Sequence, residues 1–269
     1  MAGLDVEHCL TQGLMAATGA IPGTILAHPA DVVKMRIQTS RSPVAPTMYE
    51  TMHAISRGSS VRWFDGPKPK GSLRLQAFFR DVSPLFRGLT PAIHQKMVTR
   101  FFMFLAADAS FQTLRATTSL SDTEVYFGGA MLSGYAIGSG SALWEYAKVL
   151  QSHNKSEWRA TVGDASASKR LTGRGAFAIA ACAVRTSNLR SLLRRLHAAG
   201  TRNAIFDSCF FGTQHLLSTH GNFSAPESFA FAAATAVAVD YAVDVSVKRM
   251  MLVPPNRPVG SLLETVRTL

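Results

Sequence analysis

The chain has 269 residues, of which 47% are apolar and 17% are charged, and its formal net charge is +11. This low content of charged residues excludes a disordered, charge-rich tail, and a basic, apolar chain indicates binding to nucleic acid or to a membrane. The sequence has no zinc-finger spacing, no basic helix and no set of aromatic residues suited to base stacking, which disfavours nucleic acid.

The N-terminal residues do not read as a targeting peptide. Acids occur at Asp5 and Glu7, and the first arginine is Arg36. These features match neither a secretory signal nor an arginine-rich transit peptide. We therefore expect the first structural element to be the apolar segment that follows these residues.

Five apolar segments follow one another along the chain. About 20 residues cross a hydrocarbon core of about 30 Å as a helix. Two segments, Cys9–Ala27 and Val125–Trp144, contain no charged residue. The others contain polar or charged groups, which helices lining a wet cavity or a protein interface tolerate; they are Val98–Leu114, Ala204–Thr219 and Pro226–Met251. We predict an all-α membrane protein, a bundle of about five transmembrane helices.

Small residues recur in these segments, as at Gly13, Ala17 and Gly19 in the first and at Gly134, Gly138 and Gly140 in the third. Small residues let membrane helices approach one another closely. A soluble, alanine-rich bundle is the alternative interpretation, and it accounts poorly for the long uncharged runs.

The connections between the segments differ in charge. Residues 39–88 contain eight Lys or Arg and three Asp or Glu, and residues 152–195 contain nine and two. The connections near 116–123 and 220–225 are short and nearly neutral. Because basic loops stay on the cytoplasmic side or its equivalent, we expect both long connections on one side of the membrane.

One motif identifies a family. Residues His28–Gln38 read H-P-A-D-V-V-K-M-R-I-Q, in which Pro29, Asp31 and Lys34 fit the pattern P-x-[DE]-x-x-[KR]-x-[KR]. Weaker acid–base copies follow at Glu145/Lys148 and Asp244/Lys248. The three acids are separated by 114 and 99 residues. In this motif and its spacing the chain resembles the mitochondrial carrier family, whose members contain three copies of a unit with an odd helix, a short matrix helix and an even helix.

The resemblance implies three repeats. Residues 1–123 would contain helices one and two, with an insertion at about 58–79, and residues 124–223 would contain helices three and four. Residues 224–269 would contain helix five and a matrix helix at Ser261–Leu269. A sixth helix is expected beyond Leu269, so we expect a degenerate member truncated before that helix.

The resemblance also implies a matrix-side ring of ion pairs. In the family a proline such as Pro29 kinks each odd helix, so that their ends converge and acids pair with bases on neighbouring helices. The ring would consist of Asp31, Lys34, Glu145, Lys148, Asp244 and Lys248. The third base position is Val247, and Lys248 is rotated from it by about 100°. We therefore expect Glu145 to face an empty position.

Solute contacts in the family lie midway along the even helices, which here implies Gln95, Lys96, Arg202 and Asn203. Lys96 and Arg202 could bind an anionic metabolite. The alternative, which we favour, is that both are paired or snorkelling residues of a repurposed bundle. The outer ends of the even helices lack the usual acid–base pairs, since residues 107–111 offer Asp108 without a base.

We expect a structural accessory subunit of a large inner-membrane assembly, such as a respiratory or ATP-synthase complex, that has lost transport. Its partners would be membrane lipids and other subunits that cover the sixth-helix position, without nucleic acid, and it would lie in the mitochondrial inner membrane as a multi-pass protein. A functional carrier of an anionic metabolite or nucleotide and an unrelated basic helical protein are the alternatives.

We expect no enzyme, because the sequence has no phosphate-binding glycine loop, nucleophile elbow or His-x-x-x-His motif. The three cysteines, Cys9, Cys182 and Cys209, lie far apart, which predicts free thiols rather than a disulfide framework or a metal site. No cofactor is expected, apart from bound cardiolipin as a candidate.

Overall fold

The computed structural model describes residues 6–39, 47–57, 83–152, 176–221, 223–253 and 257–268. These residues form helices and no strands, which confirms the all-α prediction. Five helices are long: α1 (Val6–Thr39), α4 (Leu89–Thr117), α5 (Asp122–Ser152), α9 (Leu189–His220) and α10 (Ala225–Leu252). The short elements are α2 (Met48–Arg57), the 3-10 helix η1 (Ser83–Phe86), α8 (Ala176–Thr186) and α11 (Leu262–Arg267).

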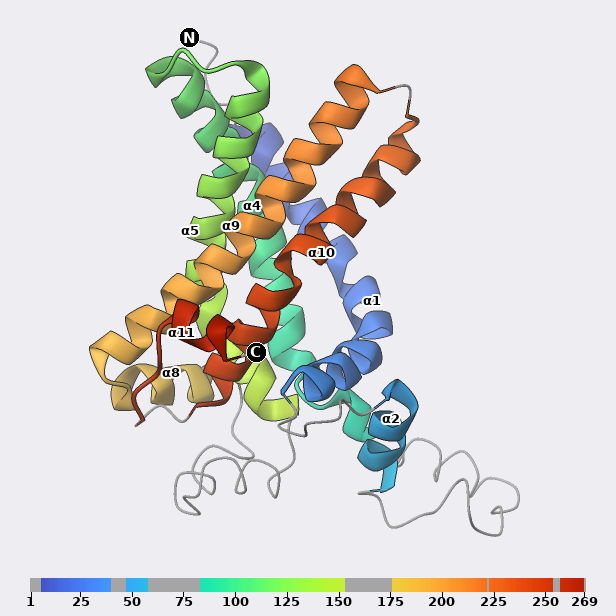
Figure 1. Cartoon of the computed structure of the whole chain (residues 1–269), viewed down its shortest axis with the longest axis vertical. Coiled ribbons are helices and arrows are strands. Elements are labelled where there is room, and N and C mark those ends of the chain that lie inside the picture. Colours follow the sequence, from blue (N-terminus) through green and yellow to red (C-terminus); the bar gives the residue numbers. More distant parts are fainter. Residues whose placement is uncertain are drawn as a thin grey trace.

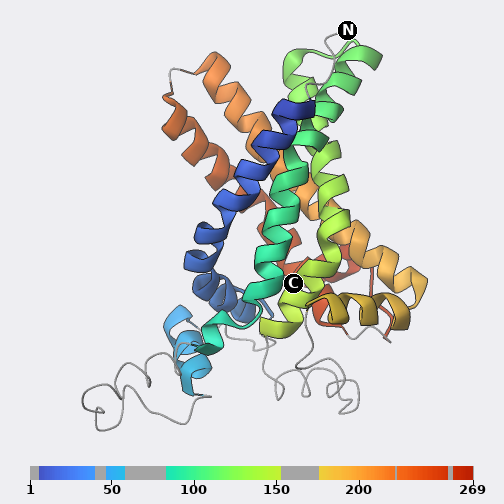
Figure 2. The same ribbon diagram turned by 180° about the vertical axis from the view of Figure 1, so that it is seen from behind.

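Each long helix contains one of the five apolar segments expected from the sequence. The helices pack in the order α1, α4, α5, α9 and α10, and α10 returns to α1. Figures 1 and 2 show the short helices α2, α8 and α11 together at one end of this bundle, where α1, α5 and α10 end. The expected insertion at about 58–79 lies outside the described residues.

Four helices begin with the same local signal. A Ser or Thr stands three residues before a Glu at Thr47/Glu50, Ser121/Glu124, Ser224/Glu227 and Ser261/Glu264. In each case the Glu carboxylate accepts a hydrogen bond from the backbone amide of the Ser or Thr, which satisfies a donor that the helix leaves free. The Thr47 amide and hydroxyl also hold the pKa of the exposed Glu50 carboxyl below its ordinary value.

Two features shape the end of the bundle where the short helices gather. Helix α1 contains Pro22 and Pro29, and Figure 2 shows its last turns swinging beneath the other helices. A proline inside a helix removes one backbone hydrogen bond and clashes with the preceding turn, which is the usual cause of such a change in direction. Gly88 begins α4 with φ of +80°, where a Cβ would lie 3.0 Å from the Lys148 carbonyl oxygen. Glycine suits this left-handed conformation and leaves room for α5.

Glycines bring α5 and α9 together, as the small-residue pattern predicts. A Cβ on Gly138 would lie 2.6 Å from the Ala199 carbonyl oxygen, and one on Gly134 would lie 2.7 Å from the Asn203 carbonyl oxygen. Gly140 on the same helix has no such neighbour within 4 Å. Close contact between these backbones therefore depends on Gly134 and Gly138, not on Gly140.

Helix α10 has buried small residues on one side and exposed large apolar residues on another. Ala232 and Ala236 are fully buried, so part of its small-residue surface is used inside the bundle. Its exposed surface carries large apolar side chains, at Phe229, Phe231, Val237, Val239 and Tyr241. By length and hydropathy α10 is the one described helix that could cross a membrane, a criterion that a core helix of a soluble protein can also meet.

We predict that Gly138→Leu destabilises the bundle, whereas Gly140→Leu does not. The new side chain at 138 would collide with backbone atoms, which cannot move aside as a side chain can, and overpacking of this kind costs about 1–3 kcal/mol or more. At 140 the same change meets open space and removes a helix-weakening glycine. Thermal unfolding of the purified chain in detergent measures both variants. Equal unfolding temperatures for the two variants would contradict the α5–α9 contact.

Candidate functional site

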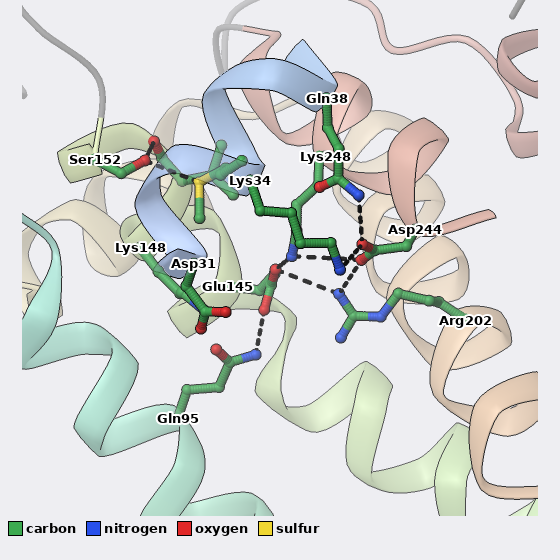
Figure 3. Close-up of polar contacts among 12 residues, drawn as sticks. Asp31, Lys34, Gln38, Gln95, Glu145, Lys148, Ser152, Arg202, Asp244 and Lys248 are labelled. Atoms are coloured by element: carbon green, nitrogen blue, oxygen red, sulfur yellow. Dashed lines mark hydrogen bonds and ion pairs between the residues drawn. The ribbon is translucent and has the colours of Figure 1, made fainter. Parts of the chain in front are cut away.

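A network of charged side chains joins α1, α5 and α10 where these helices converge (Figure 3). Each helix supplies one acid and one base, separated by three or four positions, so that both lie on the same side of the helix. The six residues are Asp31 and Lys34, Glu145 and Lys148, and Asp244 and Lys248. The structure thus brings together all six residues that the sequence assigns to the ring.

The pairing runs around the three helices in one direction. Asp31 of α1 pairs with Lys148 of α5 at 3.4 Å. Glu145 of α5 pairs with Lys248 of α10. Asp244 of α10 pairs with Lys34 of α1 at 3.3 Å, which closes the cycle. Each pair therefore crosses between two helices and ties their ends together.

The prediction that Glu145 faces an empty position is wrong. Val247 is fully buried among apolar residues, and the next residue, Lys248, reaches Glu145 instead. A one-residue offset turns the side chain by about 100°, but the flexible four-carbon stem of lysine can span the difference. Lys248 also lies 3.6 Å from Asp244, one turn earlier on its own helix.

Polar residues from the even helices α4 and α9 complete the network. Arg202 lies 3.3 Å from Glu145 and 3.4 Å from Asp244, and also donates a hydrogen bond to the Asn203 side chain. Gln95 donates to Glu145, and Gln38 of α1 donates to Asp244 at 3.0 Å. Gln95, Arg202 and Asn203, which the family resemblance suggests as solute contacts, are therefore engaged within the protein.

Arginines close the helix ends around the network. Arg36 of α1 donates to the Ser152 carbonyl at the end of α5 at 3.0 Å. Arg249 of α10 donates to the Gln38 carbonyl near the end of α1 at 3.4 Å. Each guanidinium satisfies a carbonyl that the helix leaves unpaired and adds positive charge at the negative end of the helix dipole.

A third arginine closes the end of α10. The Arg195 guanidinium donates to the Val253 carbonyl at 2.7 Å and lies 4.9 Å from the centre of the Tyr146 ring. Arg195 stands at the end of the basic stretch 152–195, but its type and position alone do not indicate this role, which depends on its burial against α10.

A cavity of about 240 Å³ lies against the network. Network residues form much of its wall, and side chains from α1, α4, α9 and α10 form the rest, namely Met35, Lys96, Phe206, Val237, Asp240 and Tyr241. Lys96 is exposed, and it forms no ion pair with any described residue. Asp240 is buried in this wall.

The opposite end of the bundle is built differently. Arg115 and Asp122 form an exposed ion pair there, which joins the end of α4 to the start of α5. Tyr126 and His215 stack with ring centres 4.1 Å apart. The side chain of Asp108 lies outside the described part of the structure. Within the described part, no ring of ion pairs corresponds to the one on α1, α5 and α10.

Other residues singled out from the sequence lie apart from the network. Cys182 and Cys209 are partly buried and belong to no disulfide among the described residues, and the side chain of Cys9 lies outside the described ones. His28 is fully buried and contacts the Arg87 carbonyl oxygen at 3.0 Å, which holds the turn before α4 against α1.

No protein-family model matches the chain, and no curated protein matches it in sequence. The likeness to mitochondrial carriers therefore depends on the motif, its spacing and the expectations drawn from them.

We predict that Glu145→Ala strongly destabilises the bundle. The change removes one acid and leaves Lys248 and Arg202 to share Asp244 as their remaining acid partner, and loss of one member of a buried pair typically costs about 3–5 kcal/mol. Asp122→Ala, which removes an exposed acid, should cost no more than about 1 kcal/mol. Chemical unfolding of both variants in detergent compares them. Equal losses would show that the buried network contributes no more than a surface ion pair.

Proposed function

We propose that this protein is a carrier-like membrane bundle that has lost transport and acts as a structural subunit of a larger inner-membrane assembly. The membrane setting is supported by the distribution of polar and apolar side chains. Glu145, Lys148 and Lys248 are at most 7% exposed, whereas large apolar side chains face outward on the long helices. Large apolar side chains exposed along several helices, with charged groups buried inside, are typical of lipid contact.

The exposed apolar residues occur along several helices, not at one patch. They include Leu10, Leu14, Ile25 and Leu26 on α1, Met131 and Leu132 on α5, and Phe229, Phe231 and Val239 on α10. In this proposal the end of the bundle with α2, α8 and α11, to which the basic connections 39–88 and 152–195 belong, faces the matrix, in keeping with the positive-inside rule. Bound cardiolipin and the mitochondrial location remain predictions from the family resemblance.

The observation that carries the loss of transport is the one-sided network. Alternating access requires that a site open to one side and then to the other, so each end must be able to close. Here one end is held by buried ion pairs, and the described side chains at the other end form no equivalent network. Arg202 of α9 further ties α5 to α10 by contacting both Glu145 and Asp244, which favours a fixed arrangement.

A carrier of an anionic metabolite is the second candidate, and Lys96 is the observation that favours it. The residue is exposed and lines the cavity wall, and it has no ion-pair partner among the described residues. A free base in a water-accessible cavity is a suitable contact for a carboxylate or a phosphate.

Reconstitution and native electrophoresis distinguish the two candidates. The purified chain in liposomes should show no saturable exchange of nucleotides, phosphate or carboxylates. In mild detergent the chain from its native membrane should migrate within a complex of high mass. Saturable exchange that Lys96→Ala abolishes and Arg115→Ala preserves, together with migration as a free monomer, would replace the structural role by the carrier function.

A further inference from the structure

Two charged side chains of the cavity wall are not used by the ion-pair network. The wall contains four acids and five bases, namely Asp31, Glu145, Asp240, Asp244, Lys34, Lys96, Lys148, Arg202 and Lys248. Seven of them pair with one another. The two that remain are Asp240 on α10 and Lys96 on α4.

Asp240 is a buried acid that forms no ion pair with the described residues. The residue is 7% exposed, and its Oδ1 atom accepts no hydrogen bond from the described part of the chain. The nearest acid along α10, Asp244, is one turn away and holds Lys34 and Arg202. A carboxylate in such surroundings is costly unless a cation or a donor reaches it. The geometry therefore leaves a place for a positive group at this point of the cavity.

Lys96 provides the opposite charge on a different helix. It is exposed at the same cavity and forms no ion pair with the described residues. Helices α4 and α10 are not neighbours in the ring of helices, because α1 lies between them on one side and α5 and α9 lie between them on the other. Figures 1 and 2 show these two helices on opposite sides of the bundle. The two unused charges thus come from opposite walls.

We propose that the cavity binds a small zwitterion, whose carboxylate contacts Lys96 and whose ammonium group contacts Asp240. A simple anion would leave Asp240 unpaired and add negative charge near it, and a simple cation would leave Lys96 unpaired. One molecule with both charges satisfies both side chains, which is how buried polar groups give specificity. The volume of about 240 Å³ is slightly below the range of about 300–1,000 Å³ for drug-sized ligands, which suits a small metabolite.

This binding site is a function beyond the structural role, because a ligand can enter the cavity from one side of the membrane and bind without being transported.

The proposal assigns the ammonium group of the ligand to Asp240 and not to Asp207 on α9, another acid without an ion pair among the described residues. Asp207 does not line the cavity. A contribution from Asp207 would therefore place the ligand elsewhere in the bundle.

The test uses the purified full chain in lipid nanodiscs and a series of ω-amino acids: glycine, β-alanine, γ-aminobutyrate and ε-aminocaproate. Because a ligand raises the unfolding temperature according to its affinity, the concentration dependence of that temperature gives the dissociation constant. We expect at least one member to bind about tenfold or more tightly than both its analogue without the amine and its analogue without the carboxylate. This comparison needs no variant, so it stands even if a variant fails to fold.

Variants then locate the site. Asp240→Asn and Lys96→Gln should each weaken binding of the zwitterion by about tenfold or more, whereas Asp207→Asn and Asp122→Asn should leave it unchanged. Binding of the single-charge anion as tight as that of the zwitterion would overturn the proposal, as would binding by none of the series. Loss of binding in Asp207→Asn with retention in Asp240→Asn would also overturn it. None of these outcomes bears on whether the chain belongs to a larger assembly.

Discussion

Buried charge is the constraint on which the rest of this bundle depends. Glu145 and Asp244 are buried between helices, and an unpaired carboxylate there would cost several kcal/mol. Bases from other helices pair with both: Lys248 and Arg202 with Glu145, and Lys34 and Arg202 with Asp244. The helices that supply those bases must therefore converge, and the bend of α1 and the glycine contacts between α5 and α9 bring their ends and neighbours into range. Charge pairing and close backbone packing thus depend on each other.

The same end of the bundle also has to satisfy the last carbonyls of three helices. Arg36, Arg249 and Arg195 supply donors to α5, α1 and α10. Two of these arginines follow network lysines on the same helix, at Lys34/Arg36 and Lys248/Arg249. One short stretch of helix therefore provides both a side chain for the ion pairs and a donor for a neighbouring helix end. Basic residues therefore outnumber acids at this end of the bundle, and the three arginines bind helix carbonyls instead of carboxylates.

Much of this arrangement could be predicted from the sequence. Uncharged runs of about 20 residues identify long helices because length and hydropathy are local properties. The motif at Pro29, Asp31 and Lys34 located the network because its spacing places acid and base on one side of a helix. The pairing of Lys248 with Glu145 could not be predicted, since it depends on how far a flexible side chain reaches between two helices. The burial of Ala232 and Ala236 likewise depends on which side of α10 meets α9.

Arg202 shows why the cavity and the network cannot be assigned separate roles from sequence alone. Its position suggests a solute contact, yet its guanidinium bridges Glu145 and Asp244. Its Nη1 atom contacts both carboxylates, and its Nε and Nη2 atoms donate to the Asn203 side chain, so the planar guanidinium holds three partners at once. Once Arg202 is engaged, the charge available to a ligand moves to Lys96 and Asp240 on the opposite walls. The network therefore determines which charges the cavity can present, and a ligand that matches them must carry both signs.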